Sequence, residues 1–182
     1  MEKKLALREF GPQLWTRELA REIRVQLLTL LDQLNPGDTA VIDAQGVQVF
    51  DYSFANELFG KTLLSLTHEY PGRFLIIENL SPYVRENLIN ALESLSLIMI
   101  ERNGGKLGLI GKVHPADRAT FEVIAGAKED EPITAAVLRD RLEANLNAVN
   151  ERLSKLTDLA LVRREQSVSP AGRAQFRYKV LS

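Results

Sequence analysis

Asp51 and Ser53 carry the first chemistry that the sequence offers. They follow a short loop after an apolar run at residues 39–43, and they stand where a helix is expected to begin. A serine hydroxyl in that position accepts hydrogen bonds from free backbone N–H groups, and a phosphate on it is stabilised by the same groups and by the helix dipole. The sequence therefore predicts either a phosphoacceptor or switch site at Ser53 and Asp51, or an ordinary helix cap formed by one of them.

A second set of candidate residues lies near the end of the chain and has the types that contact nucleic acid. Residues 145–182 hold seven Lys and Arg against three Asp and Glu, a net charge of +4, whereas the whole chain carries -1. Basic side chains bind phosphates, and amides and hydroxyls on one helix face bind base edges. The predicted DNA contacts are Asn147, Asn150, Ser154, Lys155, Arg163, Arg164 and Arg173.

Metal, thiol and nucleophilic chemistry find no support in the residue content. The chain has no cysteine, which removes disulfides, thiol nucleophiles and Cys-ligated metal sites. Neither His68 nor His114 has ligand residues beside it at metal-binding spacing. No nucleophile and base stand in a recognisable pair. We therefore expect no enzyme activity, no metal and no cofactor.

The elements that must position these residues alternate between helix and strand over the first 112 residues. Periodic apolar positions predict helices at residues 16–34, at residues 54–70 and from Ser81 onward. In the second of these helices we expect Leu58, Leu63, Leu64 and Leu66 to face inward. Short apolar runs predict strands at residues 39–43, 74–77, 97–100 and 107–110. Because helices separate the strands, we predict an α/β fold with a mixed sheet and packed helices.

From His114 the pattern changes to three consecutive helices and a hairpin. The predicted helices are residues 116–127, 134–144 and 147–159. Strand-like runs at residues 162–168 and 174–180 flank a turn at residues 169–173. Two helices joined by a short turn form a helix-turn-helix, to which the hairpin adds a wing. We therefore predict an α/β domain at residues 1–113 and an α+β winged helix-turn-helix domain at residues 114–182.

The segment around Ser53 resembles the STAS-like domain of sulfate transporters and anti-sigma factor antagonists. Their signature of a hydrophobic residue followed by Asp-Ser-Ser-Gly corresponds to Asp51-Tyr52-Ser53-Phe54, where Tyr52 and Phe54 replace the first Ser and the Gly. A fuller similarity, over about residues 5–112, is to a bacterial STAS-like family of uncharacterised function. It rests on Phe10-Gly11, Thr16-Arg17-Glu18, Asp43, Gly46-Val47 and the string at residues 53–60. The resemblance implies that a partner kinase of the GHKL ATPase type phosphorylates Ser53.

The C-terminal part, from about residue 115 to residue 182, resembles MarR-type and ArsR-type winged helices. The similarity is carried by the helix that starts at Thr134 and by Ala160-Leu161-Val162-Arg163-Arg164 before the wing. In this sequence Ala160 replaces the usual glycine. The resemblance implies DNA binding by a homodimer, because one recognition helix reads one half-site.

Together these patterns predict a cytoplasmic, DNA-binding transcriptional regulator whose STAS-like domain senses or binds a protein partner. The sequence leaves open an interaction protein that docks a GHKL-type ATPase or kinase and uses its winged helix for protein contacts. It also leaves open a small-molecule sensor with a ligand at the sheet edge. No apolar stretch suits a signal peptide or a membrane-spanning helix, so we expect no membrane association.

Overall fold

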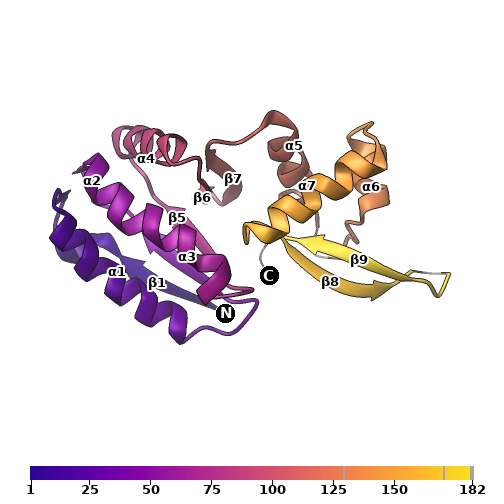
Figure 1. Cartoon of the computed structure of the whole chain (residues 1–182), viewed down its shortest axis with the longest axis horizontal. Helices are drawn as coiled ribbons and strands as arrows, with labels where there is room; N and C mark the ends of the chain where they lie inside the picture. The colour runs from indigo at the N-terminus through magenta and orange to yellow at the C-terminus, as the bar shows by residue number, and fades with distance from the viewer. Residues whose placement is uncertain (129, 170, 181–182) are drawn as a thin grey trace.

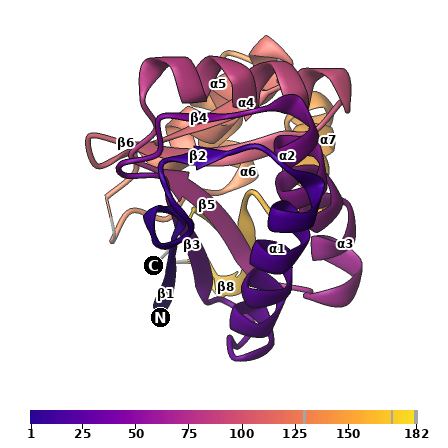
Figure 2. The same ribbon diagram turned by 90° about the vertical axis from the view of Figure 1, so that its left-hand side faces the viewer.

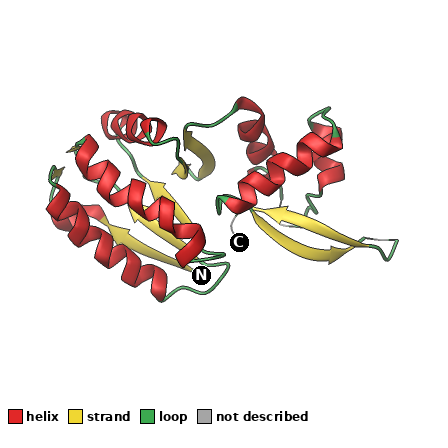
Figure 3. Ribbon diagram, viewed as in Figure 1, coloured by secondary structure: helices red, strands yellow, loops and turns green. Residues whose placement is uncertain are grey.

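The computed structural model describes residues 1–128, 130–169 and 171–180, and it confirms the predicted α/β fold class (Figure 1). Its elements are β1 (Glu2–Ala6), η1 (Leu7–Phe10), β2 (Gln13–Leu14), α1 (Arg17–Asp32), β3 (Thr39–Asp43), β4 (Val49–Phe50), α2 (Tyr52–Ala55), η2 (Asn56–Gly60), α3 (Lys61–Glu69), β5 (Phe74–Glu78), α4 (Pro82–Ser94), β6 (Ile98–Asn103), β7 (Lys106–Gly111), α5 (Pro115–Ala125), α6 (Ala135–Arg141), α7 (Leu146–Asp158), β8 (Arg163–Val168) and β9 (Ala174–Lys179). Figure 3 shows the sheet-bearing part on one side and the three helices with their hairpin on the other. Pro170 of the predicted turn, and Leu181 and Ser182 of the predicted second domain, lie outside the described residues.

A five-stranded mixed sheet organises the first part of the chain. Its strand order is β1-β3-β5-β6-β7, and β7 alone among these five runs antiparallel to its neighbour. Every residue of β3 and β5 is buried, as is expected of continuous apolar runs in strands that are covered on both faces. The turn between β6 and β7 uses Gly104 and Gly105, both with positive φ, which suits a tight hairpin turn.

One face of the sheet is covered by α1, α3 and α4. Figure 2 shows α1 and α3 along one side of the strands and α4 across the top. Ile42, Ile77 and Met99 point to this face and pack with leucines of the helices. Helices α1 and α4 begin where a side chain accepts a backbone N–H group: Thr16 accepts from Leu19, and Ser81 accepts from Val84. The first hydrophobic core therefore lies between the sheet and these three helices.

The helix that follows Asp51 contains a π-helical turn. Segments α2, η2 and α3 run on without a break, and the wider turn buries all four residues of 57–60. Leu58 and Leu66 are buried as we expect, but Leu64 is 62% exposed, so the prediction that it faces inward is wrong. Residues two positions apart in the sequence lie about 200° apart around an α-helix, so Leu64 and Leu66 cannot both face the sheet.

The other face of the sheet is covered by the C-terminal helices. Successive strand residues point to opposite faces of the sheet, so the residues between those of the first core point to this face. They pack with residues of α5, α7 and the hairpin in one buried cluster. We call it the shared cluster; its members include Phe74, Ile76, Ile98, Ile100, Leu109, Phe121, Ile124, Leu153, Leu156, Leu161, Val162 and Tyr178. The sheet-bearing part and the helix-and-hairpin part therefore have a hydrophobic core in common.

The hairpin extends away from the body of the protein (Figure 1). Strands β8 and β9 pair antiparallel from Arg163↔Lys179 to Val168↔Ala174. The Tyr178 N–H donates to the Ile133 carbonyl at 2.8 Å, so one backbone hydrogen bond joins the segment before α6 to β9. The sequence did not predict this contact, because a single residue cannot show the alternation of apolar and polar positions that indicates a strand.

Replacing Phe121 with alanine tests the shared cluster. Phe121 is fully buried on α5, which packs on β7 and α7, so we expect the free energy of unfolding to fall by about 3–5 kcal/mol. Trp15 fluorescence reports on the sheet-bearing part, and far-UV circular dichroism reports on all helices. Both urea midpoints should fall together in Phe121→Ala and stay unchanged in the exposed neighbour Glu122→Ala. An unchanged fluorescence midpoint would contradict a common core.

Candidate nucleic-acid interface

Helix α7 presents three of the predicted DNA contacts on its outward face. Asn147, Asn150 and Ser154 recur at helical spacing and are exposed, whereas the opposite side of the helix is buried in the shared cluster. The Asn145 side chain accepts from the Asn147 N–H at 2.8 Å and so caps the helix. The amide and hydroxyl groups of this face are therefore open to solvent on a rigidly held helix.

Two carboxylates share the outward face of α7. Glu151 and Asp158 are both exposed, and the Ser154 hydroxyl lies 3.5 Å from the Asp158 carboxylate. These negative charges oppose approach of a phosphate backbone along the C-terminal half of the helix. The N-terminal half, around Asn147 and Asn150, is the better placed for contact with a polyanion.

Lys155, another predicted DNA contact, is exposed but forms an ion pair with a buried carboxylate of the chain. Its ammonium donates to the Asp117 carboxylate at 2.6 Å, and Asp117 is 5% exposed. Asp117 lies in the first turn of α5, where the helix dipole also favours a carboxylate. The ion pair fixes α7 against the start of α5, so the charge of Lys155 is largely balanced within the molecule.

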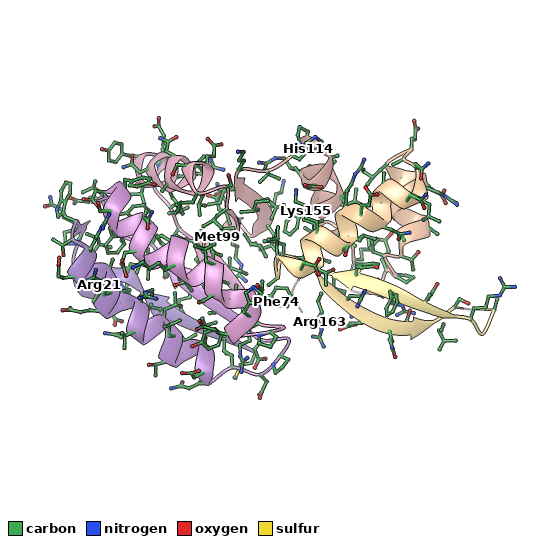
Figure 4. The ribbon with its side chains drawn as sticks, viewed as in Figure 1. Arg21, Phe74, Met99, His114, Lys155 and Arg163 are labelled. Carbon is green, nitrogen blue, oxygen red and sulfur yellow. The ribbon has the colours of Figure 1, made fainter. Side chains whose placement is uncertain are left out.

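The two arginines at the start of β8 lie in different surroundings. The Arg163 Nε lies 3.2 Å from the Glu165 carboxylate, and its guanidinium packs on Gly37, where an added β-carbon would lie 2.6 Å from Nη1. Figure 4 shows Arg163 near Phe74, at the junction of the two parts. The Arg164 guanidinium instead lies 4.7 Å above the ring centre of Phe176, in a cation–π contact on the hairpin.

Arg173 lies at the tip of the hairpin and is exposed. Its backbone N–H donates to the Ser169 hydroxyl at 3.0 Å, and its carbonyl accepts from the Ser169 N–H at 2.8 Å, so hydrogen bonds join these two residues across the end of the hairpin. Arg173 therefore lies at the end of a hairpin that extends away from the body of the protein. Arg163 and Lys155 instead lie close to the sheet-bearing part.

At the other candidate site, Asp51 forms the helix cap. Its carboxylate accepts from the Phe54 N–H at 2.7 Å, while Ser53 is the second residue of α2 and is half-buried. The parallel pairing of Leu14 with Phe50 brings Trp15 beside Asp51, and Trp15 and Tyr52 are 48% and 49% exposed. Hydrogen bonds with Ser94 and Asn56 lower the pKa of Tyr52. Exposed aromatic residues thus lie beside Asp51 in the register and directly before Ser53 in the chain.

A buried carboxylate lies one helical turn after Ser53. Glu57 accepts a hydrogen bond from Lys61 at 2.6 Å, and Arg24 and Arg21 lie 3.4 Å and 3.5 Å from its other oxygen. Burial opposes ionisation of Glu57, but the hydrogen bond from Lys61 and the three positive charges outweigh it and lower the pKa. Glu57 therefore ties α1 to the helix that carries Ser53.

Carboxylates also end the central parallel strands. Asp43 accepts from the Asn79 amide at 2.8 Å and from the Gln45 N–H at 2.9 Å, and burial is the largest influence on it, yet these bonds and the charge of Lys4 lower its pKa. Glu78 forms ion pairs with Lys4 and Arg102. Both carboxylates have their hydrogen-bond and ion-pair partners within the chain, so these interactions stabilise this edge of the sheet.

Neither a metal site nor a membrane span is found in the ranges that the structure describes. No group of three or more His, Cys, Asp and Glu side chains there is arranged to hold a metal ion. No helix in the same ranges has both the length and the apolarity that a membrane span requires.

The chain was compared with protein-family models, curated proteins and solved structures. No protein-family model and no curated protein matches the chain, so the resemblances to the STAS-like family and to MarR-type and ArsR-type winged helices stay predictions. Among solved structures, the chain is similar to a possible transcriptional regulator from Methanosarcina mazei Go1. That similarity has 21% identity and a TM-score of 0.34, and it covers 38% of this chain and 57% of the other. A TM-score of this size does not establish a common fold.

Removing the Glu57 charge tests how α1 is held to the Ser53 helix. The pKa of Glu57 is lowered from 4.5 in the folded protein, so its contribution to stability is present above pH 4.5 and is lost as the pH falls through the lower folded value. We expect Glu57→Gln to unfold with a free energy about 1–3 kcal/mol smaller at pH 7.

The measurement is urea denaturation of Glu57→Gln and of the wild-type chain at several pH values. Their difference should shrink below pH 4.5. Glu86→Gln, a change of the same type at an exposed position of α4, should match the wild type throughout. A constant difference between pH 7 and pH 3 would show that the charge of Glu57 has no part in the effect.

Proposed function

We propose that the chain binds double-stranded DNA through α7 and the β8–β9 hairpin and acts as a transcriptional regulator. The observation that carries the proposal is the order of the C-terminal elements: α5, α6, α7 and the β8–β9 hairpin, whose Tyr178 donates a backbone hydrogen bond to Ile133. This order is that of a winged helix. In helix-turn-helix proteins the second helix of the motif enters the major groove.

The exposed groups divide between base and backbone contacts under this proposal. Asn147, Asn150 and Ser154 meet base edges, since amides pair with adenine and hydroxyls pair with either purine or pyrimidine groups. Glu151 accepts a hydrogen bond from the amino group of cytosine, which selects that base. Its negative charge at the same time weakens non-specific attraction to the phosphate backbone. Arg173 binds the backbone or the minor groove beside the half-site.

Lys155 and Arg163 have a positioning role in the proposal. Their contacts with Asp117 and Gly37 hold α7 and the start of β8 against the rest of the chain. Arg164, stacked on Phe176, remains on the exposed surface of the hairpin and contributes to phosphate binding. A single α7 reads one half-site, so we infer that the active form is a homodimer whose two helices lie about 34–36 Å apart.

Reversing the charge of Arg173 tests DNA binding. Duplexes selected from a random pool by the wild-type chain should bind with strong salt dependence, because bound phosphates release counterions. We expect Arg173→Glu to bind them more weakly and to reduce the slope of log K against log salt concentration by about 1. Fluorescence anisotropy at several salt concentrations gives both values. Lys106→Glu, on the exposed β6–β7 turn, is the matched control and should bind like the wild type.

Two outcomes of that experiment count against the proposal. One is that the selection yields no duplex that the wild-type chain binds at low salt. The other is that Arg173→Glu and Lys106→Glu lose the same amount of affinity, which would indicate a general effect of net charge.

A second candidate function, an interaction protein that docks a GHKL-type ATPase or kinase, is favoured by the surface around Ser53. The exposed Tyr52 precedes this serine and the exposed Trp15 lies beside Asp51, and aromatic side chains are enriched where proteins bind one another. Phosphate on Ser53 would add a charge of about -1.5 to -2 next to Asp51. We infer that such a charge releases the partner.

Phosphate transfer from labelled ATP tests the second candidate. If an ATPase of this type is encoded beside the gene, mixing it with the wild-type chain should label the chain, and Ser53→Ala should abolish the label. Ser65→Ala, on α3, is the matched control and should be labelled like the wild type. Equal labelling of the wild type and Ser53→Ala would remove Ser53 as the acceptor.

A further inference from the structure

A cleft of about 980 Å³ lies between the sheet-bearing part and α7. One wall is formed by the starts of β6 and of α5 and the segment before α5, and the other by the outward face of α7. The lining residues are Ser96, Ile98, Lys112, Val113, His114, Pro115, Glu151, Ser154, Lys155, Asp158 and Leu159. Its volume is within the range of small-molecule sites, which occur preferentially where two parts of a protein meet.

The two walls of the cleft carry opposite charge. Lys112 contributes a cation on the wall that leads to α5, whereas Glu151 and Asp158 contribute carboxylates on α7. The remaining cation of the lining, Lys155, is balanced by Asp117. A molecule that enters the cleft therefore meets positive charge on one wall and negative charge on the other.

His114 adds a hydrogen-bond donor beside Lys112. Its Nδ1 accepts from the Ala116 N–H at 3.2 Å, which places the proton of the neutral ring on Nε2. Lys112 lies 3.3 Å from the Ser96 hydroxyl, which accepts from its ammonium. Lys112 and His114 together thus offer two donors to a carboxylate.

Apolar side chains also line both walls of the cleft. Ile98, Val113 and Pro115 line the side of the sheet, and Leu159, at the end of α7, is 39% exposed although it is a large apolar residue. A ligand that matches this surface has an apolar spine with an anionic group at one end and a cationic group at the other. A purely anionic or purely cationic ligand would meet a wall of its own sign.

We propose that the cleft binds a small zwitterion with an apolar spine, of the ω-amino acid class. Lys112 and His114 hold its carboxylate, Glu151 and Asp158 hold its ammonium, and Ile98, Val113 and Leu159 contact the spine. The regulatory consequence rests on the proposed DNA-binding function: the ligand covers Glu151 and Ser154, two of the groups assigned to base contacts, so ligand and DNA compete for α7.

The test is a titration of the ¹⁵N-labelled full chain, followed by amide NMR shifts in the absence of DNA. The probes are 8-aminooctanoate, octanoate, octylamine and 1,8-octanediol, which share a spine and differ in charge. We expect saturable shifts at residues 96–98, 112–114 and 151–159 with 8-aminooctanoate, and a dissociation constant on the order of 1 mM or tighter. The three other probes should bind at least about threefold more weakly, since each lacks one or both charge contacts.

Variants of the charged walls sharpen the test. Glu151→Gln with Asp158→Asn should reduce binding of 8-aminooctanoate to the level of octanoate and leave 1,8-octanediol unchanged. His114→Asn keeps a side chain that caps α5 and should weaken both carboxylate probes. Lys106→Gln, outside the cleft, should change nothing, and the dispersion of the amide spectrum reports that each variant is folded.

Three results would overturn the proposal: no saturable shift, shifts outside the cleft, or equal affinity for all four probes. Because the titration contains no DNA, these results are independent of the DNA-binding function. Competition is measured separately, by adding 8-aminooctanoate to the complex with a selected duplex. Binding of the probe in the cleft without any loss of bound DNA would overturn the regulatory consequence while leaving the ligand site in place.

Discussion

The apolar patch on the second face of the sheet is the constraint on which the rest of the structure depends. Phe74, Ile76, Ile98, Ile100 and Leu109 all point to that face and must be covered. Burying side chains of this size stabilises by about 1.5–3 kcal/mol each, so the five together contribute about 7–15 kcal/mol. That is comparable with the whole stability of a typical domain. The C-terminal helices are therefore held on the sheet as part of its core.

This constraint decides how a signal can pass through the molecule. Ser53 lies on the helix layer of one sheet face, and α7 packs on the opposite face. Because the shared cluster resists separation of the two parts, the proposed partner or phosphate at Ser53 would have to act on α7 through the sheet and its packed side chains. Such a core is not compatible with free movement of the C-terminal helices on a linker. The ligand proposed for the cleft would contact α7 directly.

Local patterns were sufficient to predict most of the fold. The predicted helix starts at residues 16, 81 and 134 coincide with the capping residues Thr16, Ser81 and Thr134, because the start of a helix depends on neighbours within one helical turn. Strand β1 was missed because Glu2-Lys3-Lys4-Leu5-Ala6 has few apolar residues, and its pairing with β3 defines it as a strand.

The candidate site was predicted only in part, for a similar reason. Helical spacing placed Asn147, Asn150 and Ser154 correctly on one exposed face of α7. The pairing of Lys155 with Asp117 joins residues on two different helices, and the packing of Arg163 on Gly37 depends on how the two parts of the chain meet. A count of basic residues treats every one of them as free to bind phosphate. Lys155 and Arg163 are instead engaged by contacts within the chain. The cleft likewise arises from tertiary contact and has no sequence pattern.

Native-state hydrogen exchange of the full chain tests the central claim most directly. If the sheet and the C-terminal helices share one core, amides of β5, β6, α5 and α7 open with the same free energy and show the same dependence on low concentrations of denaturant. Exchange of α5 and α7 at a clearly lower opening free energy than β5 and β6 would contradict the account, because it would mean that the helices leave the sheet while the sheet stays folded.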